Sequence, residues 1–85
     1  DEPHAWLLSG TLARRQGDLA AAQRLIERAA ELDPRDPAIG LEAGVIAALG
    51  GRDEAARRSF ESVLAAAPEG PYAAAARAYL AQLAR

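Results

Sequence analysis

Few side chains in this 85-residue chain could do catalytic chemistry. His4 is the only histidine, and although its ordinary titration range suits proton transfer, the sequence fixes no partner beside it. Ser9, Ser59 and Ser62 fall in helical patterns. They lack the strand–turn–helix elbow and the second histidine of a nucleophilic triad. The sequence therefore predicts no catalytic residue, and we expect His4 at the surface or at the edge of a groove.

The remaining polar motifs favour structural roles over metal or phosphate binding. Asp33, Asp36 and Asp53 suit linkers and helix caps, and no metal-ligand spacing surrounds them. The absence of cysteine excludes disulfides and thiolate metal sites. Gly50-Gly51 lacks the G-x-x-x-x-G-K pattern of a phosphate loop, so it indicates the end of a helix. We predict a protein that is not an enzyme and that uses no metal or cofactor.

Charge and hydropathy argue against nucleic acid and membranes as partners. Twelve acidic and ten basic residues give a net charge of -2, which offers little attraction to polyanions. Of the two basic pairs, Arg14-Arg15 and Arg57-Arg58, the second has Glu54 and Glu61 one turn away. No apolar run approaches the length of a membrane span, so we predict no membrane insertion by this segment. No targeting segment is recognisable, so the sequence does not distinguish a cytoplasmic from a periplasmic location.

The elements that must position any site are predicted to be helices. The chain contains 23 alanines but only four aromatic residues, and alanine has the highest helix propensity while being depleted in strands. Proline and glycine supply the breaks: Gly17 permits the left-handed conformation that ends a helix, and Asp18 can cap the next one. The expected helices span residues 3–16, 18–32, 37–49, 53–66 and 71–84.

The chain also repeats itself at an offset of 34 residues. The offset places Pro3 on Pro37 and Pro71, and Gly17 on Gly51. Ten of 32 positions are identical between residues 3–34 and 37–68. A fixed period of this length is typical of stacked helical or solenoid repeats.

The residues at key positions of each copy resemble those of the tetratricopeptide repeat, a 34-residue helix–turn–helix. The first copy matches at Trp6, Gly10, Gly17-Asp18, Ala22, Ile26, Ala29 and Pro34, and the second at Gly44, Gly51, Ala56, Phe60 and Pro68. The second copy departs from the pattern with Gly40 in place of the tryptophan and Val63 in place of the second alanine. Ser9 replaces a usual leucine, and Ala13 and Ala47 replace a usual aromatic residue.

This resemblance implies an all-α, right-handed repeat array (α-solenoid) that forms a single domain over residues 1–85. Residues 3–34 and 37–68 would be two full repeats, and residues 71–85 a C-terminal capping helix equal to half a repeat. The family implies a non-catalytic protein–protein interaction module or scaffold. Its members that clamp acidic C-termini use lysine and asparagine, which this chain lacks, so a different ligand class is expected.

The resemblance further implies that the first helix of each repeat lines a concave groove. We predict that this groove binds a protein partner, as a peptide or helix with apolar anchors, and that Arg14 and Gln82 supply its hydrogen-bond donors. Leu41, Val45 and Tyr79 could instead pack against neighbouring helices or a larger parent protein. The predicted groove residues are Leu7, Thr11, Arg14, Leu41, Val45, Tyr72, Tyr79 and Gln82.

The expected fifth helix suggests an alternative function. A terminal helix of a solenoid normally turns a polar face to water, yet Arg77, Gln82 and Arg85 are the only strongly polar residues in this one. The alternative is a structural or homo-oligomerisation module, with a possible homodimer through the C-terminal helix, or a fragment of a longer array. A further alternative is that the alanine-rich face of this helix is only weakly apolar and remains exposed to water.

Overall fold

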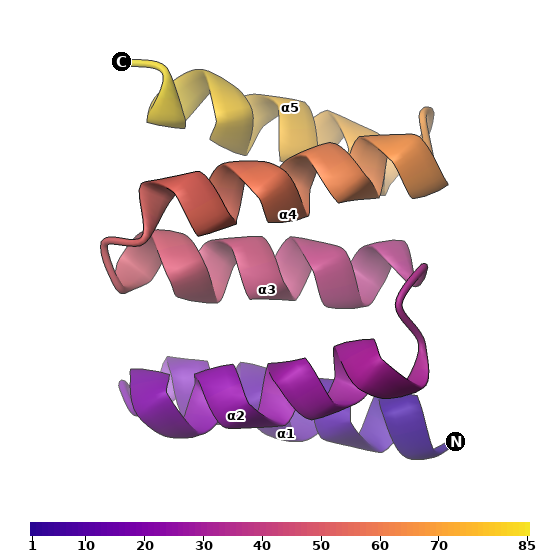
Figure 1. The fold of residues 1–85 in the computed structure, drawn as a ribbon, viewed down its shortest axis with the longest axis vertical. Helices are drawn as coiled ribbons and strands as arrows, with labels where there is room; N and C mark the ends of the chain where they lie inside the picture. Colours follow the sequence, from indigo (N-terminus) through magenta and orange to yellow (C-terminus); the bar gives the residue numbers. More distant parts are fainter.

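The computed structural model describes residues 1–85 as five α-helices without strands. The helices are α1 (Glu2–Arg15), α2 (Leu19–Leu32), α3 (Pro37–Leu49), α4 (Asp53–Ala66) and α5 (Pro71–Leu83). They stack along the longest axis of the molecule, from α1 and α2 at one end to α5 at the other (Figure 1). The predicted all-α helical repeat array is confirmed, and every helix boundary lies within one residue of the expected position.

Local capping residues explain where the helices begin. The carboxylates of Asp1, Asp18 and Asp36 each accept a hydrogen bond from a backbone N–H in the first turn, at 2.9, 3.0 and 2.9 Å. Proline occupies the first turn of α1, α3 and α5, where its missing N–H leaves no unsatisfied donor. In α4 the cap position is Arg52, which makes no side-chain cap, and Asp53 and Glu54 follow in the first turn.

The two turns inside the repeats have the same geometry. Gly17 and Gly51 adopt positive φ angles of 82° and 76°, a conformation that glycine reaches without the steric cost of a Cβ. In both turns the N–H of the residue after the glycine donates to a carbonyl five residues earlier, at 3.0 Å from Asp18 and 2.9 Å from Arg52. The sequence identity at this position therefore reflects a shared backbone requirement.

The buried side chains form two clusters that meet at α3. The first joins α1, α2 and α3 through Leu7, Ala13, Ala22, Ile26, Ala29, Ile39 and Ile46. The second joins α3, α4 and α5 through Ala47, Ala56, Phe60, Val63 and Ala76. Because α3 contributes to both, it couples the two ends of the stack. None of the five helices has the length and hydropathy needed to cross a bilayer.

Close packing explains why the second repeat has glycine at Gly44, which matches the family pattern, and at Gly40, which departs from it. A Cβ added at Gly44 would lie only 2.6 Å from Cζ of Phe60, and one at Gly40 would lie 2.9 Å from Cγ2 of Val63. Both distances are too short for real carbon contacts. Gly40 therefore makes room for Val63, which is larger than the alanine at the matching position of the first repeat.

Candidate partner-binding groove

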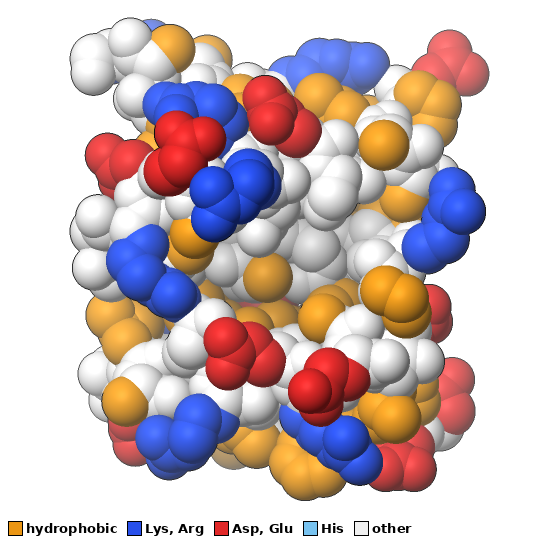
Figure 2. Space-filling view, in the orientation of Figure 1, with side chains coloured by type: hydrophobic (Ala, Val, Ile, Leu, Met, Phe, Trp, Pro, Cys, Tyr) orange, Lys and Arg blue, Asp and Glu red, His pale blue; other side chains and the backbone are white.

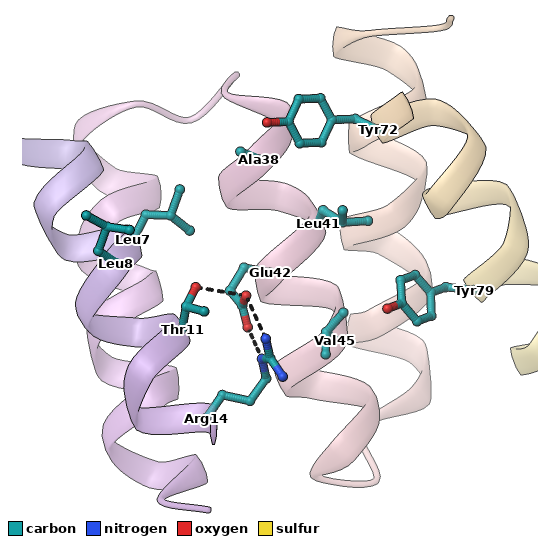
Figure 3. Close-up of a pocket in the computed structure, with 10 residues that line it drawn as sticks. All are labelled: Leu7, Leu8, Thr11, Arg14, Ala38, Leu41, Glu42, Val45, Tyr72 and Tyr79. Atoms are coloured by element: carbon teal, nitrogen blue, oxygen red, sulfur yellow. Dashed lines mark hydrogen bonds and ion pairs between the residues drawn. The ribbon is translucent and has the colours of Figure 1, made fainter. Parts of the chain in front are cut away.

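An open pocket of about 340 Å³ lies between α1, α3 and α5 (Figure 3). The second helices α2 and α4 contribute no residue to it, so the groove belongs to the face that the first helix of each repeat forms. Seven of its ten lining residues are hydrophobic. The lining residues are Leu7, Leu8, Thr11, Arg14, Ala38, Leu41, Glu42, Val45, Tyr72 and Tyr79.

The pocket brings together seven of the eight predicted groove residues. Leu7, Thr11 and Arg14 come from α1, Leu41 and Val45 from α3, and Tyr72 and Tyr79 from α5. Gln82 is exposed near the end of α5 and does not line the pocket.

Three lining residues were not predicted from the sequence. Leu8 precedes Thr11 by three positions, Ala38 precedes Leu41, and Glu42 precedes Val45. Because residues three apart on a helix share a face, the helical period could have identified all three.

A charged cluster crosses the groove between α1 and α3 (Figure 3). The Glu42 carboxylate accepts hydrogen bonds from Oγ1 of Thr11 at 2.9 Å, from Nη2 of Arg14 at 3.4 Å, and from Nε of Arg14. The side chains of Arg14 and Glu42 are only 24% and 11% exposed. The sequence predicted Arg14 as a donor to the partner, but two of its guanidinium nitrogens are engaged by Glu42.

The apolar residues of the groove also belong to the core. The ring of Tyr79 stacks on Phe60, with ring centroids 5.0 Å apart and an interplanar angle of 11°. Tyr79, Leu41 and Val45 are half-buried and pack against the second cluster. They therefore pack against neighbouring helices, as one alternative from the sequence held, and still present one side to the pocket.

The rims of the groove are its most accessible parts. Leu8 is 58% exposed on the α1 side and Tyr72 is 42% exposed on the α5 side. Figure 3 shows the hydroxyls of Tyr72 and Tyr79 pointing toward α3. Neither hydroxyl is hydrogen-bonded within the chain. Both can therefore bond to a partner's backbone.

The opposite face has a different character. Figure 2 shows basic and acidic side chains mingled over α2 and α4. Two of their ion pairs are short-range pairs within one helix, Arg28–Glu31 at 3.2 Å and Arg57–Glu54 at 2.7 Å. Such exposed pairs contribute little to stability. No group of three or more His, Asp or Glu residues is placed to hold a metal ion.

The structure refines the surface expected on α5. Of its large apolar residues, Tyr79, Leu80 and Leu83 are half-buried against the second cluster, and Tyr72 is exposed at the rim of the groove. The exposed residues on the rest of the helix include Ala74, Ala78 and Ala81 together with the polar Arg77 and Gln82. Homodimerisation through α5 remains a prediction, and a glutamate at Ala78 would test it without removing a core residue.

Comparison with known proteins supports this description of the chain. A family model described as tetratricopeptide repeat matches residues 7–71, from within α1 to the first residue of α5. A search of curated proteins found no significant match.

Proposed function

Because this chain belongs to the tetratricopeptide repeat family, whose repeats generally mediate protein–protein interaction, we propose that its groove binds a peptide or short helix of a protein partner. Members of the family are typically non-catalytic interaction modules. The observation that carries the proposal is one open, mainly apolar pocket lined by all three first helices. The other face is a mixed, solvated surface.

The lining indicates a partner with apolar anchors and no required charge. Leu7, Leu8 and Leu41 offer apolar surface, and burying one leucine-sized anchor contributes about 1.5–3 kcal/mol. Glu42 is already neutralised by Arg14, so a charged partner group would meet no free opposite charge there. The tyrosine hydroxyls would fix the position of the partner's backbone.

The test is a selection of displayed random 12-residue peptides against the 85-residue chain. We expect the selected peptides to be rich in large apolar residues and low in net charge. Binding of a selected peptide should weaken at least tenfold with Tyr72→Ala, which removes an exposed rim residue, and with Leu41→Arg, which places a charge in the pocket. Leu49→Ala is the matched control, because Leu49 is 59% exposed and does not line the pocket.

Unfolding in urea must accompany each binding measurement. Tyr72→Ala should leave stability near that of the original chain, since the side chain is 42% exposed. Peptides that bind the Tyr72→Ala and Leu41→Arg chains as tightly as the original chain would refute the groove as the binding site.

A further inference from the structure

The 34-residue offset allows the same face of the three first helices to be compared. In α3 this face carries Ile39 and Ile46, which are 2% and 1% exposed. In α5 the matching residues are Ala73, which is 0% exposed, and Leu80, which is half-buried. This face is therefore buried on α3 and buried or half-buried on α5.

A second helix of the preceding repeat covers the face in both cases. Ile39 and Ile46 belong to the cluster that contains Ile26 and Ala29 of α2, with Leu25 packed against it. On α5, Ala76 and Leu80 of the same face lie in or against the cluster built around Phe60 and Val63 of α4. The usual occupant is thus an amphipathic helix with a small-and-large apolar inner face.

In α1 the matching residues are uncovered. These residues precede Ile39, Glu42 and Ile46 of α3 by 34 positions. They are Ala5, Leu8 and Leu12, and each of them is exposed. Leu8 and Leu12 are 58% and 57% exposed, among the most exposed large apolar residues of the chain. No helix lies beyond α1 and α2 at this end of the stack (Figure 1).

We propose that this outer face of α1, formed by Ala5, Leu8 and Leu12, is a docking surface for an amphipathic helix with the inner-face pattern of α2. The pattern consists of Ala22, Leu25, Ile26 and Ala29. The argument for this occupant is continuity, because the same register receives α2 on α3 and α4 on α5. Leu8 also lines the groove, whereas Ala5 and Leu12 do not, so this surface shares only Leu8 with the one proposed for peptide binding.

A second copy of the chain fits this face less well. Its α2 and α4 are both used inside their own clusters. The side left free at the far end, on α5, offers Ala74, Ala78 and Ala81 and no large apolar side chain to fill the space around two leucines. We therefore assign the docking helix to a segment other than residues 1–85.

The test extends the full chain with a helix in the register of the array. Residues 17–36 are copied and placed directly before Pro3, replacing Asp1 and Glu2, so that the added linker meets Pro3 as the natural one meets Pro37. The unfolding equilibrium constant is measured in urea with and without the substitution Leu12→Ala. In the 85-residue chain, Leu12→Ala should change this constant by less than threefold. In the extended chain it should change it by more than tenfold, because Leu12 becomes a core residue.

Two controls make the result specific. Leu49→Ala, at a leucine that is 59% exposed and lies outside this face, should have the same small effect in both chains. An extension with Asp in place of its copies of Leu25 and Ile26 should return the Leu12→Ala effect to the small value. An equal effect of Leu12→Ala in all chains would overturn the proposal, whether the added helix folds elsewhere or remains unfolded.

Sedimentation of the unextended chain tests the competing occupant. We expect a monomer at high micromolar concentration. A dimer that Leu12→Glu abolishes and Leu49→Glu preserves would assign the face to a second copy and overturn the helix assignment. Neither result depends on peptide binding, because the groove is tested through Tyr72 and Leu41.

Discussion

The two repeats fill the space between their helices in opposite ways. In the first repeat the large residues come from both helices, with Trp6 on α1 and Ile26 on α2, and a Cβ at Gly10 would find ordinary contacts, the nearest at 3.5 Å. In the second repeat α3 has Gly40 and Gly44, and α4 supplies Phe60 and Val63. At these positions the second repeat has its large side chains on the second helix only. The comparison teaches that the space between paired helices can be filled by large side chains from both helices or from the second helix alone.

The contacts between repeats differ in a second way. Thr11 and Arg14 of α1 meet Glu42 of α3 through hydrogen bonds and an ion pair. The residues 34 positions later in the sequence are Val45, Ala48 and Ala76, which lie in or against the second cluster. The same three positions are thus polar at one junction and apolar at the next, so the second junction forms without an ion pair at these positions.

The largest expected effect comes from Phe60, the largest fully buried side chain of the chain. Phe60→Ala should lower the free energy of unfolding by about 3–5 kcal/mol, because Phe60 is 0% exposed and stacks on Tyr79. Ile26→Ala, at the matching position, should cost less, about 2–4 kcal/mol, because Trp6 remains in the first repeat. Urea unfolding measures both, and an equal cost would contradict this difference between the repeats.

The polar junction should be fragile to single changes and tolerant of a complete exchange. Arg14→Ala should cost about 2–3 kcal/mol, because it leaves the carboxylate of Glu42 nearly buried with Thr11 as its remaining partner. The triple variant Thr11→Val, Arg14→Ala and Glu42→Ala copies the apolar junction and should lie within about 1 kcal/mol of the original chain.

Urea unfolding again decides the outcome at this junction. Arg28→Ala is the control for loss of an exposed pair, with side chains 49% and 67% exposed, and should change stability by less than about 0.5 kcal/mol. A triple variant as unstable as Arg14→Ala would show that the ion pair itself is required.

Replacing a helix glycine by alanine should change the free energy of unfolding in opposite directions in the two repeats. Gly44→Ala should destabilise the chain by roughly 1–3 kcal/mol, because its Cβ would overlap the ring of Phe60. Phe60→Ile places at this position the residue type found at Ile26 in the first repeat. In a chain with that substitution, Gly44→Ala should be tolerated. Thermal and urea unfolding of the four variants in this cycle would show a coupling between positions 44 and 60, and simple additivity would count against the steric explanation.

Among the buried positions, the smallest effect is expected at Gly10. Gly10→Ala should stabilise the chain by about 0.5–1 kcal/mol, because alanine is the better helix former. The added Cβ would meet backbone atoms of Ile26 and Ala22 at 3.5 and 3.6 Å, which are ordinary contacts. A lower melting temperature for this variant would mean that both repeats have equally tight helix approaches.

The local structure could be predicted from the sequence because its determinants act over a few residues. The caps at Asp18 and Asp36, the prolines in the first turns and the glycine turn at Gly17 each fix a helix boundary through neighbouring backbone atoms. The resemblance to the tetratricopeptide repeat implied the groove residues, and the pocket contains seven of the eight that were predicted.

Contacts between helices were decided only by the tertiary structure. The Glu42 carboxylate meets Arg14 and Thr11, 28 and 31 residues away, and this contact turns an expected donor into part of the groove's own framework. Tyr79 lines the pocket and also stacks on Phe60, while Gln82 lies beyond it. Helical spacing determines which residues share a face, but the distance and angle between helices determine what that face touches, and these depend on side-chain volumes from distant parts of the chain.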